Sequence, residues 1–178
     1  MIVGSALSEL ALWQPPTGAQ ALLKEDFVAH LREHEDGWSR ECRPDHLTAS
    51  ALVVDAARTR VLLCLHRKVG LWLQFGGHLE AEDTSVAGGA LREAREESGI
   101  DGVTLVGSGP LRLDRHAAPC DALARHHLDV QYLAVAPDAA EPRTSSESLD
   151  VRWFGADALP EATDDAVRQL VRDACGSR

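Results

Sequence analysis

The sequence predicts an α/β sandwich, in which a central β-sheet lies between layers of helices. Three observations lead to this prediction. Apolar residues with helical spacing begin the chain, strand-like stretches lie on both sides of a central helical segment, and residues 163–174 have the spacing of an amphipathic terminal helix. No internal repeat is present, and a chain of 178 residues is one ordinary domain with an appendage.

Helical signals fill the first part of the chain. Three residues are spaced for one face of a first helix: Leu7, Leu10 and Ala11. Prolines at 15 and 16 end that segment, and Thr17 can cap a second helix. The apolar stripe of this second helix consists of Leu23, Phe27 and Leu31. We therefore expect an N-terminal helical extension over residues 1–43 and a main domain over residues 44–178, with Pro44 at the boundary.

The main domain begins with the pattern of a β-hairpin. Residues 46–54 are rich in β-forming side chains, residues 55–58 have the composition of a turn, and residues 61–65 are again apolar. A polar triplet, His66-Arg67-Lys68, follows the second strand. An apolar stretch at 71–75 then leads into two glycines.

Residues 76–100 are the most informative stretch of the chain. Gly76 and Gly77 indicate a turn, and a helix is expected to begin just after Asp83, Thr84 or Ser85, any of which could cap it. Gly99 stands where a left-handed residue ends a helix. A pair of glycines at 88–89 interrupts the helix, where each costs about 1 kcal/mol relative to alanine. We therefore expect another element to pack closely there.

Three carboxylates share one face of this helix, because Glu93, Glu96 and Glu97 are spaced i, i+3 and i+4. Like charges one turn apart repel, and Arg92 and Arg95 offset only part of that repulsion. One interpretation is a solvated helix face with salt bridges. The other is a site for hard divalent cations, which take oxygen ligands.

This stretch resembles the Nudix box, whose pattern is Gly, five residues, Glu, seven residues, and Arg-Glu-aliphatic-x-Glu-Glu-x-Gly-aliphatic. Gly77 opens the box here, and residues 92–100 match every fixed position of its closing half. Two departures occur in the opening half. Asp83 stands where the family has Glu, and eight residues rather than seven separate it from Arg92. The box covers about a seventh of the chain, and its long motif is specific.

The resemblance implies the Nudix fold, a mixed sheet between helices, and metal-assisted attack of water on a nucleoside diphosphate linked to another group. By position, Glu93, Glu96 and Glu97 would bind Mg²⁺, for which Mn²⁺ could substitute, and the Gly76 carbonyl would add a ligand. Arg92 would orient the glutamates. The expected substrate is a small molecule that contains phosphate.

Further residues of the expected site are less closely tied to the motif. Some relatives have a catalytic glutamate in the loop before the late strand that contains Trp153, and Glu147 has that place here, with Asp150 as its competitor. Either acid could instead be a solvated loop residue. Arg67 and Lys68 could contact substrate phosphates or form a solvated strand end.

The rest of the chain supplies more strands and a final helix. Strand patterns are expected at 103–106, 111–113, 127–136 and 151–154, and residues 117–124 and 137–148 are expected to be loops. His126 and His127 could contact substrate, and we interpret them as ordinary strand residues. In the final helix, three residues should face inward: Val167, Leu170 and Val171.

Composition and charge exclude several classes of protein. The formal net charge of −10 argues against binding of a nucleic-acid polymer, which usually requires a basic patch. The sequence contains no run of eighteen apolar residues, which a membrane span would need, and no signal peptide is evident. Four widely spaced cysteines (42, 64, 120 and 175) are expected to be reduced thiols of a cytoplasmic protein. The N-terminal segment could cover the site or form a homodimer contact.

Two alternative functions remain open at this stage. A Nudix fold could serve as a ligand-binding or regulatory module, because fold does not determine function. The intact set of glutamates argues against that alternative. An isoprenoid diphosphate isomerase would need a catalytic cysteine and glutamate at the site, and the sequence does not place Cys64 or Cys120 there.

Overall fold

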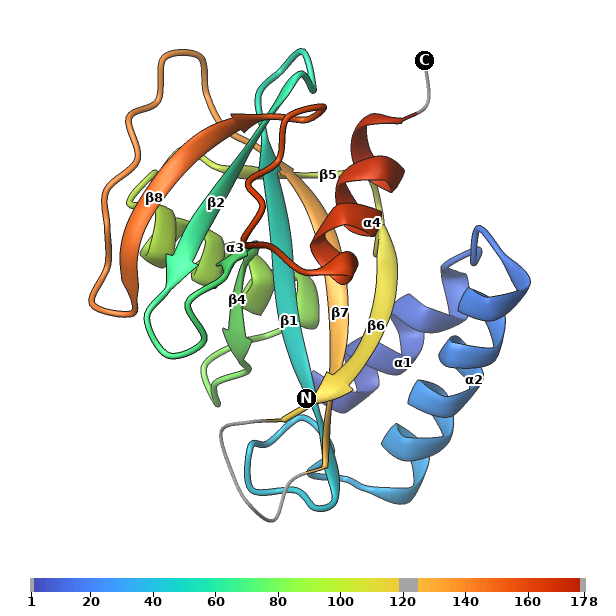
Figure 1. Ribbon diagram of the computed structural model, residues 1–178. Coiled ribbons are helices and arrows are strands. Elements are labelled where there is room, and N and C mark those ends of the chain that lie inside the picture. Colours follow the sequence, from blue (N-terminus) through green and yellow to red (C-terminus); the bar gives the residue numbers. More distant parts are fainter. Residues whose placement is uncertain (1, 119–124, 177–178) are drawn as a thin grey trace.

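Two parallel strands, β1 (Asp45–Val54) and β7 (His126–Val135), form the centre of the fold and pair along their whole length (Figure 1). The computed structural model describes residues 2–118 and 125–176, in which eight strands form one sheet. The other elements are α1 (Ile2–Leu12), α2 (Gly18–Glu33), β2 (Arg60–His66), β3 (Trp72–Leu73), β4 (Phe75–His78), α3 (Val86–Ser98), β5 (Thr104–Val106), β6 (Arg112–Ala117), β8 (Ser148–Gly155) and α4 (Asp165–Cys175).

The sheet is mixed, as the sequence predicts, and it divides at both edges of the central pair. Along one edge of β1, β4 pairs with residues 48–51 and β2 with residues 53–54, both antiparallel. Along the outer edge of β7, β6 and β5 are likewise antiparallel. β2 also pairs antiparallel with β3 and with β8. The predicted hairpin at 46–65 is therefore confirmed, with Val54 opposite Val61.

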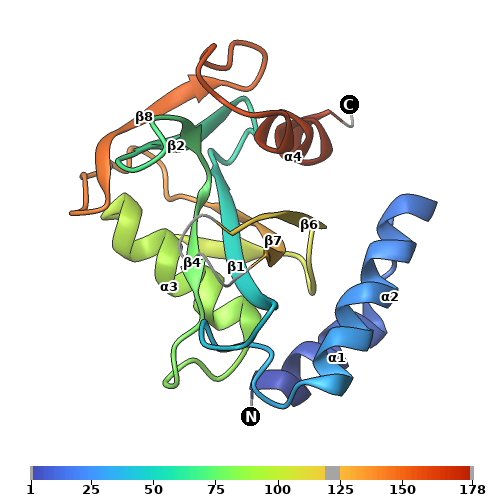
Figure 2. The same cartoon turned by 60° about the horizontal axis from the view of Figure 1, so that its bottom comes forward.

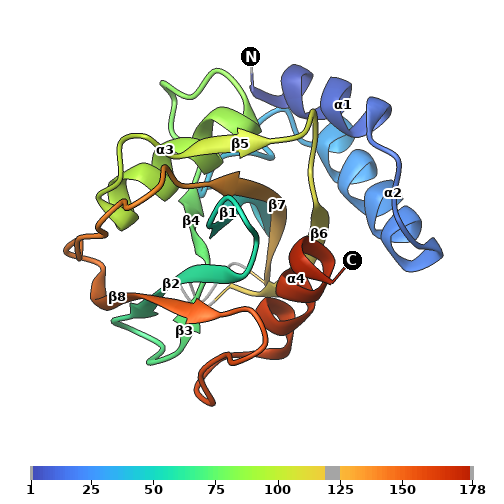
Figure 3. The same cartoon turned by 90° about the horizontal axis from the view of Figure 1, so that it is seen from above.

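Helices cover both faces of the sheet, which confirms the predicted sandwich (Figure 3). Alternate residues of a strand point to opposite faces. Ala49 and Val53 of β1 belong to the core that includes α1, α2 and α3, whereas Leu52 and Val54 belong to the core beneath α4. The α4 face continues beyond this second core as a row of buried polar residues of β1: His46, Thr48 and Ser50.

The two N-terminal helices are present as expected and pack against each other beside the sheet (Figure 2). The Thr17 hydroxyl accepts a hydrogen bond from the Gln20 amide N–H at 3.2 Å, which is the predicted cap. Phe27 and Leu31 are buried as expected. The first helix differs from the prediction, because its buried face consists of Ile2, Ala6 and Leu10, whereas Ala11 is exposed.

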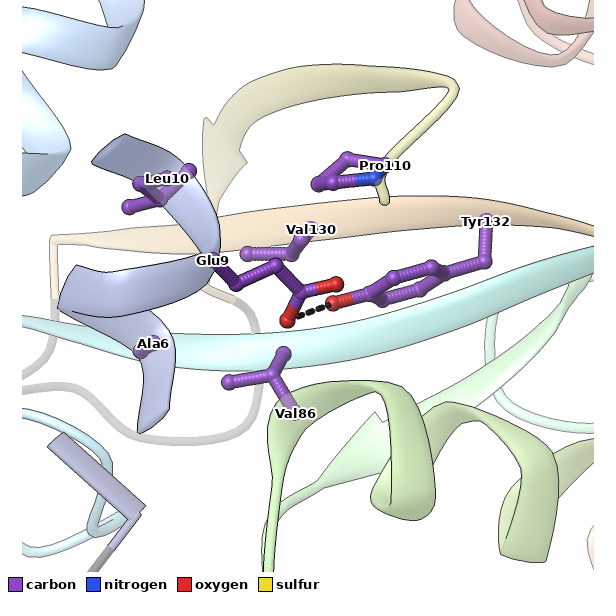
Figure 4. A pocket seen from close by; sticks show the side chains of 7 residues that line it. All are labelled: Ala6, Glu9, Leu10, Val86, Pro110, Val130 and Tyr132. Carbon is purple, nitrogen blue, oxygen red and sulfur yellow. Dashed lines mark hydrogen bonds between the residues drawn. The ribbon is translucent and has the colours of Figure 1, made fainter. Parts of the chain in front are cut away.

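Two polar contacts attach these helices to the sheet. The Gln20 side chain donates to the Leu113 carbonyl at 2.9 Å and accepts from the Leu113 N–H at 2.7 Å, so it pairs with β6 as a neighbouring strand would. Tyr132 of β7 donates a hydrogen bond from its hydroxyl to Glu9 of α1 at 2.9 Å (Figure 4). Val86, the first residue of α3, lies beside this pair. The extension therefore shares one core with the rest of the chain, and a domain boundary at 43/44 stays a prediction.

The later elements also follow the sequence closely. The Asp164 side chain caps α4 by accepting from the Val167 N–H at 2.8 Å, and the three predicted inward residues of α4 are buried. β6 and β8 extend beyond the predicted strands, to Ala117 and from Ser148. Most of the expected loop at 117–124 lies outside the described residues. Among the described residues, no helix has the length and apolar character needed to cross a bilayer.

Glu9 provides a pH-dependent test of how the N-terminal extension is attached. Burial raises the pKa of Glu9, and the hydrogen bond from Tyr132 lowers it by less. A carboxyl group whose pKa is raised by folding contributes stability below its unfolded pKa, about 4.3, and that contribution is lost as pH rises through the folded pKa. Glu9→Gln stays neutral, so its free energy of unfolding should exceed that of the wild type increasingly from pH 4 to pH 8.

Urea denaturation across this pH range measures the difference. Glu25→Gln is the matched control, because Glu25 is exposed on the neighbouring helix α2. Its curve should run parallel to that of the wild type. A Glu9→Gln curve that is also parallel to that of the wild type would contradict a raised pKa of Glu9 in the folded protein.

Candidate functional site

Helix α3 carries the three glutamates, and both of its ends are capped. Of the three predicted candidates, Ser85 is the N-cap, and its hydroxyl accepts from the Gly88 N–H at 2.9 Å. Gly99 ends the helix in the left-handed conformation with φ of 67°, as predicted. These two caps leave Glu93, Glu96 and Glu97 on the last turns of the helix.

Gly76 and Gly77 lie in strand β4, so the predicted turn at these glycines is wrong. They pair with Ser50 and Ala49 of β1. A Cβ atom on Gly76 would lie 2.4 Å from Ser50 Cβ, and one on Gly77 would lie 2.7 Å from Glu93 Oε1. Gly76 is therefore required by the close approach of the β1 backbone, a common reason for glycine inside a strand, whereas a side chain at Gly77 would displace the Glu93 carboxylate.

The glutamates differ in burial and in their partners. Glu97 is 6% exposed and accepts a hydrogen bond from the Gly76 N–H at 3.0 Å, whereas the Glu96 side chain is 61% exposed. Burial raises the pKa of Glu97 to about 8, and the charges of Glu93, Glu147 and Glu96 add to the increase. Burial also raises the pKa of Glu93, although Arg92 opposes that effect. Negative charge is thus concentrated where little water can screen it.

Arg92 organises this cluster through five hydrogen bonds. Its guanidinium binds both carboxylate oxygens of Asp83, at 3.1 and 2.9 Å, and donates to Glu93 at 3.0 Å and Glu96 at 3.2 Å. The fifth bond, at 3.1 Å, goes to the His78 carbonyl of β4. Arg92 therefore binds two of the three glutamates and also connects α3 to the loop before it.

Asp83, the residue that departs from the box, has a clear structural role. Burial alone would raise its pKa, but hydrogen bonds from Arg92 and the Glu80 N–H outweigh that effect and lower it. A Cβ atom on Gly89 would lie 2.5 Å from Leu79 Cδ2 and 3.0 Å from Asp83 Oδ2. The expected close packing at the glycine pair is confirmed at Gly89, where the loop before α3 crosses the helix.

Glu147 and Asp150, the two candidate bases, have different surroundings. Glu147 is exposed, and its charge contributes to the raised pKa of both Glu93 and Glu97. The Asp150 carboxylate instead accepts from the Val151 N–H at 2.8 Å and pairs with Arg152. The choice of Glu147 over Asp150 as the base stays a prediction.

Arg67 and Lys68 also differ in their contacts. The Arg67 guanidinium donates to the Ser146 carbonyl at 3.1 Å and the Ser148 carbonyl at 3.3 Å, and its amide N–H donates to the Glu147 carbonyl at 3.1 Å. Arg67 therefore holds the loop that carries Glu147. Lys68 is exposed, and its charge contributes to the lowered pKa of His78.

A group of buried polar side chains that the sequence pattern did not predict lies on the α4 face of the sheet. Asp129 is 3% exposed and accepts from the Thr48 hydroxyl at 3.1 Å and the Ser50 hydroxyl at 2.7 Å. Farther along the same face, burial lowers the pKa of His78 to about 4 and that of His127 to about 3, with neighbouring histidines adding to both shifts. The sequence does contain a signal for this polar group, because polar residues stand at every second position at the start of β1.

Cys64 bears on the isomerase alternative. It is 2% exposed, and burial, followed by the charges of Glu97 and Glu147, raises the pKa of its thiol to about 12. Cys64 therefore lies near the glutamates as a protonated, buried packing residue, without the accessible surface that catalysis on a substrate would need. Cys42 is also a buried free thiol, and Cys120 lies outside the described residues.

The donor groups of this site fit a hard divalent cation. Carboxylates and a backbone carbonyl are the oxygen ligands that Mg²⁺ takes in proteins. Buried carboxylates with raised pKa values also mark a place where additional positive charge would be favourable. The residues present therefore fit Mg²⁺ by charge and by donor type.

Comparison with known proteins gives a consistent result. A family model described as NUDIX domain matches residues 44–174. Among solved structures, a NUDIX-family hydrolase from Clostridium perfringens is similar with a TM-score of 0.62 and 24% identity, over 74% of this chain and 96% of that one. Comparison with curated proteins gave no match.

Two further structures are similar over comparable lengths. The dihydroneopterin triphosphate pyrophosphohydrolase of E. coli has a TM-score of 0.59 and 21% identity, over 75% of this chain and 95% of that one. An ADP-ribose pyrophosphatase from Streptococcus suis has a TM-score of 0.54 and 24% identity, over 74% and 91%. At these identities the likeness concerns the fold.

The position of Arg67 gives a prediction about the Glu147 loop. Arg67→Ala removes both guanidinium bonds to the loop carbonyls, so amide hydrogen exchange at residues 145–148 should become about 10-fold faster. Arg67→Lys should have an intermediate effect, because one ammonium group can replace part of the contact. Lys68→Ala is the matched control and should leave the exchange unchanged. Equal exchange in Arg67→Ala and the wild type would show that the loop does not depend on Arg67.

Proposed function

We propose a function from the premise that this chain belongs to the NUDIX family, whose domain model covers residues 44–174. The chain is a Nudix-type pyrophosphohydrolase, so a phosphoanhydride is the bond it cleaves. The proposed reaction is metal-dependent attack of water on that bond in a nucleoside diphosphate linked to another moiety. The substrate is a small phosphate-containing molecule.

One observation carries the proposal: the buried carboxylate of Glu97 and the partly buried carboxylate of Glu93 lie directly against the backbone of Gly76 and Gly77. We assign Glu93, Glu96, Glu97 and the Gly76 carbonyl as the groups that would hold Mg²⁺, or Mn²⁺ in its place. When bound, such ions polarise phosphoryl oxygens, neutralise developing charge and lower the pKa of bound water.

Within this proposal, the protein side chains have separate tasks. Arg92 keeps Glu93 and Glu96 oriented toward the site through its hydrogen bonds. Glu147 accepts the proton of the attacking water, supported by its accessible carboxylate near the other acids. Arg67 positions the Glu147 loop through the bonds from its Nε and Nη2 to the loop carbonyls.

Lys68 is the favoured phosphate contact of the two basic residues. The chain carries a net charge of −10, so an anionic substrate is repelled over most of its surface. Lys68 is exposed at the turn after β2, and its positive charge acts at His78 of β4. A local cation there, together with bound divalent ions, would offset the repulsion.

The fold leaves the substrate to be found by experiment. Similar structures carry the names of enzymes acting on dihydroneopterin triphosphate and on ADP-ribose, two different phosphoanhydrides. A suitable panel contains nucleoside triphosphates, oxidised nucleotides, nucleotide sugars, ADP-ribose, dinucleotide cofactors and dinucleoside polyphosphates. Each compound is assayed with and without Mg²⁺.

The first activity prediction concerns Glu96. Glu96→Gln removes one charged ligand while keeping the side-chain size, so Mg²⁺-dependent turnover of the best substrate should fall at least about 100-fold. Glu82→Gln, an exposed glutamate of the loop before α3, is the control and should retain activity. Full activity in Glu96→Gln, or turnover that persists in a chelator, would exclude the proposed metal site.

The second activity prediction separates the two candidate bases. Glu147→Gln should lower kcat by about 100-fold or more, because a general base contributes on that order. Mg²⁺ affinity, measured by calorimetry, should change little. Asp150→Asn should have a small effect, and Glu141→Gln, an exposed acid of the same loop, should have none. A larger loss in Asp150→Asn than in Glu147→Gln would reverse the assignment.

A further inference from the structure

Three histidines from three strands bring their ring nitrogens together on the α4 face of the sheet. They are His46 of β1, His78 of β4 and His127 of β7, and one nitrogen from each ring lies within 4.8 Å of the other two. His46 Nε2 and His78 Nε2 are 3.2 Å apart. The ring centroids of the three pairs are separated by 5.0 to 5.2 Å.

The register of the sheet holds the three histidines together. His46 and His127 are direct neighbours across the parallel β1–β7 pair. His78 pairs with Thr48, which is two residues beyond His46 and therefore on the same face. The three rings are attached to paired backbones of the central sheet, so their spacing does not depend on the conformation of a loop.

We propose that His46, His78 and His127 form a second metal site, which binds a divalent transition-metal ion of the Zn²⁺ type. Three protein ligands and one open position are the usual set for an accessible zinc site. Two nitrogens, each about 2.05 Å from a tetrahedral ion, are separated by about 3.3 Å. The hydrogen-bond contact between His46 Nε2 and His78 Nε2 is 3.2 Å long, so replacing its shared proton by an ion requires little change in this spacing. The His127 nitrogen lies within 4.8 Å of both, so small side-chain rotations complete the set.

The donor chemistry distinguishes this site from the glutamate cluster. Neutral imidazole, the form in which coordination occurs, suits Zn²⁺, Co²⁺, Ni²⁺ and Cu²⁺, whereas carboxylate and carbonyl oxygens suit Mg²⁺. The two sites lie on opposite sides of β4. Gly77 faces Glu93 of α3, and the next residue, His78, faces the other two histidines.

The surroundings provide access and a neighbouring imidazole. His46 is fully buried, whereas His78 and His127 are only partly buried, so an ion can approach from their side. His116 of β6 is exposed, and its ring centroid is 5.3 Å from that of His127. The Asp114 carboxylate is hydrogen-bonded to His116 Nδ1 at 2.9 Å, which orients the His116 ring. His46 therefore lies at the buried end of the site, and His78 and His127 lie at its accessible end.

The experiment uses full-length protein without a histidine tag and titrates Co²⁺ in the presence of excess Mg²⁺. The wild type should bind one equivalent that Mg²⁺ does not displace, with the visible absorption of four-coordinate Co²⁺. Glu96→Gln should bind Co²⁺ equally well, which separates this site from the proposed catalytic one. His127→Ala should weaken Co²⁺ binding by at least about 10-fold.

His126→Ala is the matched control, because this neighbouring residue of β7 points to the opposite face, where it contacts Asp45. It should bind Co²⁺ as the wild type does. His78→Asn is a second ligand variant, and circular dichroism checks that each variant folds. The proposal is overturned if Mg²⁺ displaces all Co²⁺ from the wild type, a result that needs no variant. It is also overturned if folded His127→Ala and His78→Asn both bind Co²⁺ normally.

Discussion

The close contact between α3 and β4 is the constraint on which the site depends. Gly77 has no side chain, so the Glu93 carboxylate can lie against the strand backbone, and the Gly76 N–H reaches Glu97. A Cβ atom at Gly77 would lie only 2.7 Å from Glu93 Oε1 and would displace that carboxylate. Because the helix approaches this closely, two carboxylates lose most of their water. Their raised pKa values follow from that burial.

Such burial of like charges is tolerated because Arg92 lies within the same group. One guanidinium neutralises Asp83 through two bonds and donates to Glu93 and Glu96 from its Nη1. The planar five-donor group of arginine suits this task, which a lysine could not perform. Asp83 in turn fixes the preceding loop against Gly89. The shorter acid at position 83 and the glycine within the helix therefore belong to one packing arrangement.

Features encoded by neighbouring residues could be predicted from the sequence, and features that depend on strand register could not. The Thr17 cap, the Gly99 helix end and the shared face of the glutamates follow from spacing along a helix. The strand at Gly76 and Gly77 was not predicted, because the close contacts of these glycines are with residues 49–50 and 93, which are distant in the sequence. The contacts of Arg67 with the Glu147 loop could not be predicted for the same reason, since its partners are about 80 residues away.

Strand β4 shows how one short segment can serve two kinds of chemistry. Its period of two residues directs Phe75 and Gly77 toward α3, and Gly76 and His78 toward the opposite face. A shift of one residue in its pairing with β1 would exchange these faces, placing His78 against Glu93 and removing the space that Gly77 provides. That shift is opposed because it would also withdraw Phe75 from the core, where its side chain is fully buried. Gly77 thus allows the helix to approach, and the alternation along β4 keeps oxygen ligands and imidazoles on separate faces.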